Sequence, residues 1–243
     1  MGKKLKDRVV VVTGSAGLLG REFCKAISRE GGHVWGVDLK NSHNADVNWI
    51  GDVTDPEAAP SLMAELDRDV YGLVNCAAIN PKVEDGLPPG TFENTSLESW
   101  RESLSVGLDG AFLFCRTFAP HMADNGEGAI VNMGSVLSVI APDQRLYEDS
   151  VKPASYCVEK WGIVGLTKYL ATYYGDRNVR CNTLSPAGVF AGQPGDFVER
   201  LSEKIPMGRM CWKGELRGAL IYLLTNGYTN GHNLVVDGGY SVW

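Results

Sequence analysis

The sequence predicts an α/β protein built on a doubly wound, seven-stranded parallel sheet with helices on both faces. Two observations predict this fold class. Short apolar runs of about five residues alternate with longer stretches of helical period along the whole chain, in the order strand, helix, strand, helix. The 243 residues include 44% hydrophobic residues, 29 Gly and 11 Pro, which is enough for a large buried core with ordinary turns.

Each strand is predicted by one apolar run. Helix boundaries between the runs are marked by particular residues: Asp55-Pro56 predicts an N-cap followed by a first-turn proline, and Gly31-Gly32 predicts a helix end. No linker, repeat or low-complexity tract divides the chain, so we expect residues 1–243 to form a single domain. The predicted strands are Val9–Val12, His33–Val37, Val47–Ile50, Gly72–Val74, Ala129–Met133, Arg180–Leu184 and Asn233–Val236.

The charge balance excludes several classes of partner. With 23 Lys and Arg against 29 Asp and Glu, the formal net charge is −6, so no global positive field attracts nucleic acid or anionic lipid. No apolar run approaches the roughly 18 residues of a membrane span. Met1–Arg8 passes directly into the first strand without the apolar segment of a secretion signal. We therefore expect a cytoplasmic protein that binds neither nucleic acid nor membranes.

The six cysteines form neither a Cys-x-x-Cys pair nor a Cys/His cluster with zinc-ligand spacing. We therefore expect no metal site. We interpret the thiols as small packed side chains in a reducing compartment. They are Cys24, Cys76, Cys115, Cys157, Cys181 and Cys211.

A glycine-rich turn follows the first strand directly and runs into a predicted helix. Glycines there let the backbone approach a pyrophosphate, and the helix N-terminus offers unpaired N–H groups and the positive end of its dipole. Asp38 closes the second strand 18 residues after Gly20, where an acid can bind the adenosine ribose diol. The sequence thus predicts a Rossmann-type dinucleotide site with contacts from Gly14, Ser15, Gly17, Leu18, Leu19 and Asp38.

Asp38 also predicts which dinucleotide is bound. Its carboxylate would repel the 2′-phosphate of NADP, and none of Ser15, Ala16 and Leu39 is basic, so NAD is favoured. Lys40 is the one nearby cation that could admit NADP, and we interpret it as a solvated loop lysine.

Further motifs occur in a fixed order along the chain. Asp52-Val53 follows the third predicted strand, Asn75-Cys76-Ala77-Ala78 follows the fourth, and Ser135 precedes Tyr156-x-x-x-Lys160. Together with Pro186 and Val236-Asp237-Gly238-Gly239, these motifs resemble the single-domain subgroup of the short-chain dehydrogenase/reductase family over essentially the whole chain. The resemblance implies a homodimer or homotetramer. It also implies the catalytic residues Ser135, Tyr156 and Lys160 and cofactor contacts from Asp52, Val53, Asn75, Ala77, Tyr156, Lys160, Pro186 and Val189.

The implied catalytic residues suit alcohol oxidation coupled to hydride transfer. Tyr156 and Lys160 are four residues apart and share one face of a helix. An ammonium and the positive nicotinamide favour the phenolate of a side chain that otherwise titrates near pH 10, so Tyr156 can accept a proton from a substrate hydroxyl. Ser135 would hold the reacting oxygen, with Ser138 as a second candidate. We expect an NAD-dependent oxidoreductase that interconverts a secondary alcohol and a ketone.

Three departures from the family pattern keep other functions open. The glycine spacing is that of the longer sugar-nucleotide subgroup, Gly107 stands where the family has a relay asparagine, and Ala187 and Ala191 replace an expected Gly and Thr. A backbone carbonyl at position 107 can still hold a relay water. The alternatives are a non-catalytic dinucleotide sensor or scaffold, and an epimerase or dehydratase that keeps NAD tightly bound.

The segment between Ser135 and Tyr156 is longer than is usual in the family. The insertion, at about residues 141–153, is polar and charged, which predicts a small polar substrate. Arg145 and Lys152 within it are candidate contacts for an anionic group.

The stretch at about residues 190–212 has a mixed composition without clear period, and the family resemblance implies that it is a substrate lid, with Arg209 and Trp212 as further candidate contacts. A looser similarity links the chain to the branch of the family found with flagellin-modification and nonulosonic-acid pathways. That similarity implies a sugar-like substrate, such as a sugar phosphate, an amino sugar or a nucleotide sugar.

Overall fold

The computed structural model describes residues 3–79, 91–147 and 151–243. Seven parallel strands form one sheet in the order β3-β2-β1-β4-β5-β6-β7, which confirms the predicted fold class. The largest differences from the predicted strand ranges are two residues, at the start of β4 and at the end of β6. The strands are β1 (Val9–Thr13), β2 (His33–Asp38), β3 (Val47–Ile50), β4 (Val70–Asn75), β5 (Gly128–Met133), β6 (Val179–Pro186) and β7 (Asn233–Val236).

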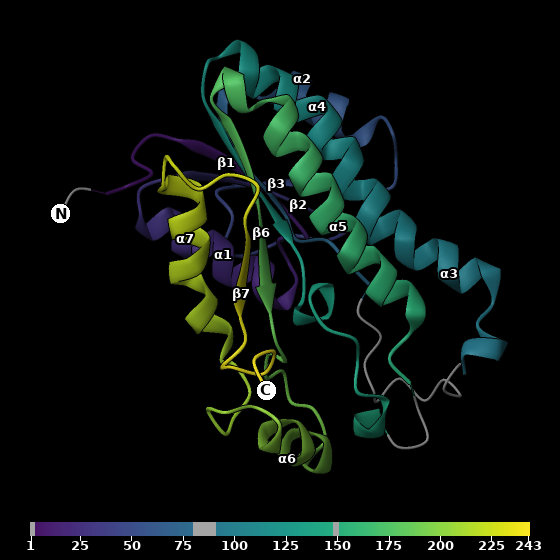
Figure 1. Ribbon diagram of the computed structural model, residues 1–243. Coiled ribbons are helices and arrows are strands. Elements are labelled where there is room, and N and C mark those ends of the chain that lie inside the picture. Colours follow the sequence, from purple (N-terminus) through teal and green to yellow (C-terminus); the bar gives the residue numbers. More distant parts are fainter. Residues whose placement is uncertain (1–2, 80–90, 148–150) are drawn as a thin grey trace.

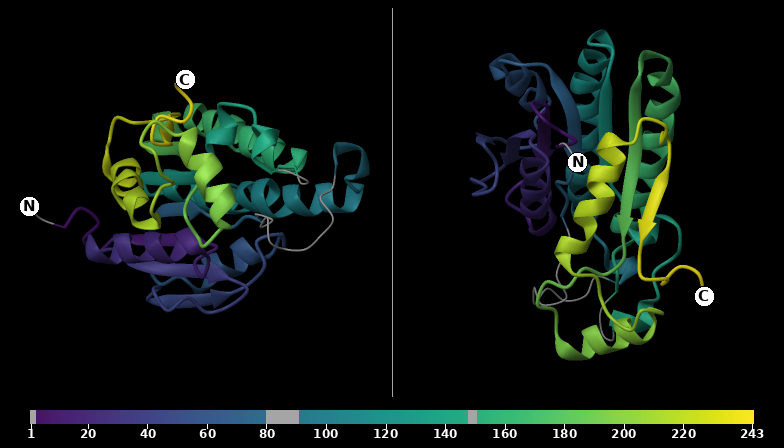
Figure 2. Two further views of the ribbon diagram at one scale, coloured as in Figure 1. Left: turned by 90° about the horizontal axis from the view of Figure 1, so that it is seen from below. Right: turned by 90° about the vertical axis from the view of Figure 1, so that its left-hand side faces the viewer.

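Helices cover both faces of the sheet (Figure 1), and Figure 2 shows the same layers from two further sides. On one face α1 packs against α7, and on the other α2, α4 and α5 lie over the strands. None of the described helices is long and apolar enough to cross a membrane. The helices are α1 (Leu18–Arg29), α2 (Ala58–Glu65), α3 (Leu97–Leu104), α4 (Gly110–Asp124), α5 (Ala154–Tyr173), α6 (Gly195–Glu203) and α7 (Arg217–Thr225).

The apolar run of β1 reflects its position inside the sheet. Successive side chains of a strand point to opposite faces, so a strand covered on both faces must be apolar throughout. Val11 packs in the core cluster of Phe118 from α4, whereas Val12 packs in the cluster of Phe23 from α1. Helix α1 ends just before Gly31, as the sequence predicts. Helix α2 begins at Ala58 with Glu57 at its N-cap, so the prediction of Asp55 as N-cap and Pro56 as first-turn proline is wrong by two residues.

The carboxyl ends of the strands form one edge of the sheet, toward the bottom of Figure 1. Strand order reverses at this edge, because β2 and β3 lie on one side of β1 and β4 lies on the other. Such a switch point opens a ligand-binding crevice in α/β sheets. Beyond the ends of β6 and β7 lies α6, and Leu146 from the insertion shares an apolar cluster with Phe197 and Leu201 from α6. The insertion and the lid, far apart in the sequence, therefore pack together.

Candidate active site

The glycine turn lies at the crevice between β1 and β4. Gly14 has a φ of +65°, which glycine adopts without a steric penalty, and a Cβ at this position would lie 2.7 Å from Ala77 N. Thr13 Oγ1 accepts hydrogen bonds from the N–H groups of Cys76 (3.1 Å) and Ala77 (3.2 Å). The motifs that follow β1 and β4 are thus held against each other.

Helix α1 begins with an uncapped N-terminus beside this turn. Gly17, at the N-cap, has no side chain to accept a hydrogen bond, and the first turn holds no acidic residue. Within the described chain, the N–H groups of Leu18 and Leu19 have no hydrogen-bond acceptor. Free N–H groups at the positive end of a helix dipole fit the charge and geometry of a pyrophosphate.

Asp38 is fixed beside the turn by two backbone hydrogen bonds. Its Oδ2 accepts from Ala16 N (3.0 Å) and its Oδ1 accepts from Lys40 N (3.3 Å). Ser15, in contrast, is fully buried and its N–H donates to Val37 O (3.2 Å). Ser15 thus supports the turn, and its Oγ is buried without a hydrogen-bond partner in the described chain, while its contact with a cofactor stays a prediction.

The remaining cofactor positions border the same edge of the sheet. Asp52 lies in an exposed turn after β3, where its Oδ1 accepts hydrogen bonds from Thr54 N (2.9 Å) and Thr54 Oγ1 (2.8 Å). Val53 is buried in the core. Pro186 is the last residue of β6, and Val189, three residues later, forms an isolated β-bridge with Cys211 at the base of the lid.

Asn75 takes a different place from the expected one. Its Nδ2 donates to Asn132 Oδ1 (2.8 Å), and Asn132 Nδ2 donates to Thr167 Oγ1 (2.9 Å). Thr167 Oγ1 also accepts from Thr183 Oγ1 (2.8 Å). These bonds join β4, β5, α5 and β6 behind the crevice. Asn75 is 5% exposed and its side chain supports the sheet, while its contact with a cofactor stays a prediction.

Ser135 and Ser138 have distinct environments. Ser135 follows β5 and caps a 3₁₀ turn, where its Oγ accepts a hydrogen bond from Leu137 N (3.2 Å). Ser138 Oγ donates to Ser135 O (2.6 Å) and lies 3.1 Å from Ser185 Oγ, with 1% of the residue exposed. Ser138 is thus part of the core, which leaves Ser135 as the candidate hydroxyl.

Helix α5 brings Tyr156 and Lys160 to the end of β5. Lys160 Nζ donates to Met133 O (3.1 Å) and lies 5.4 Å from the centre of the Tyr156 ring. Burial acts to lower the pKa of Lys160, but the neighbouring Tyr156 and Glu159 act to raise it, and the pKa lies above its ordinary value. Since Ser135 lies two residues after Met133, all three predicted catalytic residues lie around one strand end.

Lys152 is the insertion residue that the structure brings to this place. Its Nζ lies 3.7 Å from the centre of the Tyr156 ring, within cation–π range. Gln144 holds the backbone at Lys152, because Gln144 Oε1 accepts from Lys152 N (2.8 Å). Burial lowers the pKa of Lys152 to about 8.

The other two predicted substrate cations are engaged in ion pairs. Arg145, whose side chain is 84% exposed, makes two hydrogen bonds to Asp143 (2.8 and 2.9 Å). Arg209 makes two hydrogen bonds of 2.7 Å to Glu215. Each guanidinium is thus paired with a carboxylate of its own segment, and the contact of either arginine with a substrate stays a prediction. The pairs also hold the pKa values of the two carboxyls below their usual range, with that of Glu215 at about 2.

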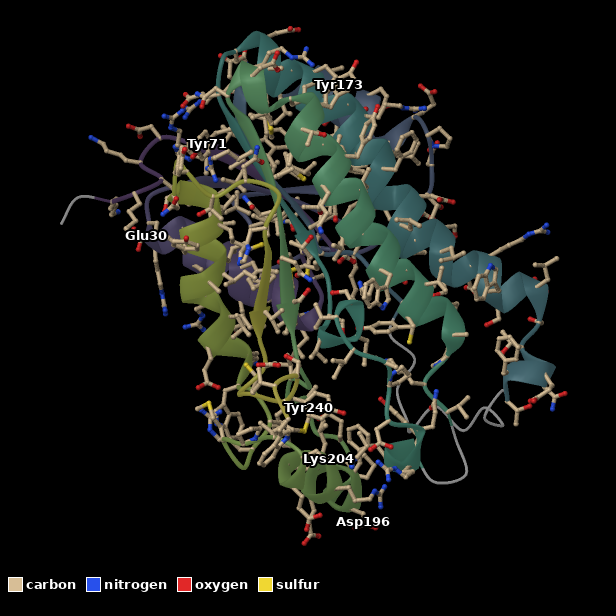
Figure 3. All side chains as sticks on the ribbon, in the orientation of Figure 1. Glu30, Tyr71, Tyr173, Asp196, Lys204 and Tyr240 are labelled. Carbon is tan, nitrogen blue, oxygen red and sulfur yellow. The ribbon has the colours of Figure 1, made fainter. Side chains whose placement is uncertain are left out.

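The lid is tied to the insertion and ends in an exposed aromatic residue. Asp143 also pairs with Lys204 at the end of α6 (2.7 Å), and Figure 3 shows Lys204 near Tyr240. Tyr240 belongs to the same apolar cluster as Tyr156. Trp212 is 56% exposed and its ring stacks edge-on against Phe190 at 5.2 Å. Trp212 therefore lies at the outer side of the lid.

Sequence reasoning missed two acidic residues. Asp143 links the insertion to the lid, and Glu159 is fully buried beside Lys160. For Glu159 a signal was present, since it directly precedes Lys160 and a buried lysine needs a counter-charge. For Asp143 no local signal existed, because Lys204 is distant in the sequence.

Comparison with known proteins identifies the family. A family model described as enoyl-(acyl carrier protein) reductase matches residues 16–241. The D-threitol dehydrogenase of Mycolicibacterium smegmatis is 31% identical, with 98% of this chain and 95% of the relative covered.

Two solved structures are also similar. A short chain dehydrogenase of Leptospira borgpetersenii with bound NAD⁺ has a TM-score of 0.90 at 29% identity, with 98% of this chain and 94% of that chain covered. A putative NAD(P)-dependent gluconate 5-dehydrogenase of Beutenbergia cavernae, with NADP at low occupancy, has a TM-score of 0.86 at 29% identity, with 98% and 99% covered. On these matches, the chain belongs to the short-chain dehydrogenase/reductase family and is an oxidoreductase that uses a nicotinamide dinucleotide.

Proposed function

We propose that this enzyme oxidises a secondary hydroxyl of a small polyol to a ketone, with NAD as the hydride acceptor. The observation that carries the proposal is the convergence of Ser135, Tyr156 and Lys160 at the end of β5, where Lys160 Nζ is anchored on Met133 O. The similarity to a D-threitol dehydrogenase supports a polyol rather than a phosphorylated sugar.

Each of the three residues has one task in the proposed reaction. Tyr156 accepts the proton of the substrate hydroxyl, and the Lys160 ammonium favours the phenolate that does so. Ser135 Oγ already accepts a hydrogen bond from Leu137 N, so its own O–H is available to donate to the reacting oxygen. The dinucleotide, when bound, supplies the hydride acceptor.

The residues at the crevice fit a dinucleotide, and one of them favours NAD. The free N–H groups of Leu18 and Leu19 suit the pyrophosphate, and the missing Cβ of Gly14 lets the backbone of Ala77 pack against the turn that presents them. The fixed carboxylate of Asp38 suits a ribose diol and repels a 2′-phosphate. Asp52, Val53, Ala77, Pro186 and Val189 would complete the site through groups at the same edge.

A sugar acid is the second candidate substrate, and Lys152 is the observation that favours it. An ammonium 3.7 Å from the Tyr156 ring centre can hold a carboxylate while the tyrosine attacks a nearby hydroxyl proton. The gluconate dehydrogenase among the similar structures supports this class. The insertion and the lid, within one domain of residues 1–243, would then enclose the substrate.

We further propose that the enzyme is a homodimer or homotetramer in the cytoplasm. Helices α4 and α5 expose large apolar side chains, with Phe112 at 47%, Trp161 at 53% and Tyr169 at 62% exposure, which suits an interface between copies of the chain. All six cysteines are free thiols, which suits a reducing compartment.

The test is turnover of a panel of polyols and sugar acids with NAD and with NADP, followed as reduced nicotinamide at 340 nm. We expect NAD-dependent oxidation of at least one polyol. The variant Tyr156→Phe should lose about 10²–10⁴-fold in kcat while its affinity for NADH stays near that of the parent. Turnover by Tyr156→Phe at the parent rate would overturn the assignment. No turnover with any substrate would favour a sensor, and NAD that copurifies in stoichiometric amount would favour an epimerase or dehydratase.

A further inference from the structure

Glu159 is a buried carboxylate to which the proposed reaction gives no task. It lies on α5 between Tyr156 and Lys160 and is 0% exposed. Among the described residues only one other carboxylate is buried, that of Glu22 on α1. A charged side chain in the interior is costly unless a counter-charge and hydrogen bonds compensate it, so its contacts indicate why it is there.

The contacts of Glu159 lead directly to Lys160. Glu159 Oε1 lies 2.7 Å from Lys160 Nζ, and both side chains are almost completely buried. Glu159 Oε2 accepts a hydrogen bond from Ser103 Oγ on α3 (3.4 Å). Oε1 has no other hydrogen-bond donor in the described part of the chain. The carboxylate therefore holds the ammonium from one side, and Met133 O holds it from the other.

The space for this carboxylate exists because position 107 is glycine. Gly107 lies in a π-helical turn, Ser105–Asp109, that joins α3 to α4. A Cβ on Gly107 would lie 2.0 Å from the carboxyl carbon of Glu159. No side chain can occupy both places, so the glycine at 107 and the glutamate at 159 form one arrangement.

We propose that Glu159 is a positioning residue for the reaction: it fills the space left open by Gly107, orients the Lys160 ammonium and keeps it charged beside Tyr156. The proposal rests on the proposed roles of Tyr156 and Lys160. It also explains why Lys160 has a polar partner although Gly107 has no side chain: the Glu159 carboxyl group occupies the space at position 107 and contacts the Lys160 ammonium.

The charges around Lys160 indicate what removal of the Glu159 carboxylate would do to the protonation of the lysine. Lys152 faces the same tyrosine ring and adds a second positive charge, and the Cys76 thiol after β4 stays neutral because burial raises its pKa to about 12. Glu159 is thus the one carboxyl group among the described residues that act on the pKa of Lys160. Without it, burial would act on the ammonium uncompensated, and Lys160 would lose its proton at lower pH.

The first test is the pH dependence of Glu159→Gln, which keeps the shape of the side chain and removes its charge. We expect the alkaline limb of kcat for alcohol oxidation to move to lower pH by about 1–3 units. An NMR titration of the Lys160 side chain in the protein without cofactor, assigned with Lys160→Met, should show the same shift. A pH profile and titration identical to those of the parent would overturn the proposal.

Glu22→Gln is the matched control. Glu22 is also buried and ion-paired, with Arg217, Lys25 and Lys213, but it lies on α1. We expect Glu22→Gln to lower the melting temperature without moving the pH profile. An equal shift of the pH profile in both variants would contradict a specific role for Glu159. Loss of turnover in Tyr156→Phe with a parental profile in Glu159→Gln would refute only this inference and leave the proposed function standing.

A paired exchange keeps the proposal testable if Glu159→Gln does not fold. Gly107→Asn alone should lose at least about tenfold in kcat because its side chain meets the Glu159 carboxyl, and Glu159→Ser alone should lose a similar factor. In the double variant the amide at 107 can enter the vacated space and hold the Lys160 ammonium, so we expect kcat at pH values below the alkaline limb within about threefold of the parent. The alkaline limb itself should stay at the lower pH of Glu159→Gln, because the amide carries no charge. A double variant no better than Glu159→Ser would show that the two positions are not coupled.

Discussion

Substitution of Gly14 by alanine tests whether the close approach of the β1 and β4 motifs builds the dinucleotide site. The φ of +65° costs an alanine about 1–2 kcal/mol. The added Cβ would also lie 2.7–2.9 Å from backbone atoms of Cys76 and Ala77, which cannot move freely because both N–H groups are bonded to Thr13 Oγ1. Such overpacking costs about 1–3 kcal/mol, for a combined loss of about 2–5 kcal/mol.

Two assays measure the effect of Gly14→Ala. In a chain of this length each kcal/mol lowers the melting temperature by about 2–4 °C, so we expect a loss of roughly 4–20 °C. The turn must shift to relieve the overlap, and the affinity for NADH, measured by fluorescence titration, should fall about 10–100-fold.

Gly126→Ala separates backbone strain from overlap. Gly126 has a similar φ of +76°, but a Cβ there would meet no atom within 4 Å. We expect this variant to lose only about 1–2 kcal/mol and to bind NADH like the parent. Equal losses of stability in the two variants, or parental NADH affinity in Gly14→Ala, would refute the reasoning.

Three further predictions concern the choice of cofactor, the charge of the substrate and the position of the lid. Asp38→Asn keeps a hydrogen-bond acceptor for Ala16 N–H but removes the negative charge that repels a 2′-phosphate. The ratio of kcat/KM for NAD to kcat/KM for NADP should therefore fall about 10–100-fold. An unchanged ratio would contradict the role of the carboxylate. Because burial lowers the pKa of Lys152 to about 8, its ammonium is present below that pH and lost above it. The KM for a sugar acid should therefore rise above pH 8 in the parent and be independent of pH in Lys152→Met, whereas the KM for a neutral polyol should not respond in either protein. Asp143→Asn breaks the ion pair from the insertion to Lys204 on the lid, so the KM for substrate should rise several-fold at nearly unchanged kcat; steady-state kinetics that match the parent would show that the pair does not position the lid.

Several features of the site could be predicted from the sequence because each depends on neighbouring residues. Strand β1 is a continuous run of valines because both faces of the sheet are covered, and the glycine turn follows it immediately. Tyr156 and Lys160 are one helical turn apart, so their common face follows from helix geometry alone. Residues close together in the sequence were therefore sufficient to predict the strand, the turn and the common face of the two side chains.

Other placements depend on partners that are distant in the sequence. Asn75 is engaged by Asn132 on another strand, and its place in the core depends on how β4 and β5 align. The sequence offers Ser138 as a second candidate beside Ser135, but in the structure Ser138 meets Ser185 on β6 and lies in the core.

By itself, the sequence determined the fold class, the dinucleotide crevice and the tyrosine–lysine pair, because hydrophobic period, glycine position and helical spacing act over a few residues. Only the tertiary structure decided which polar side chains remain available at that crevice. Burial forces each polar group to find a partner, and those partners come from other strands and helices. The glycine at 107 shows the difference: in the sequence it is a missing side chain, and in the structure it is the space that receives the Glu159 carboxylate.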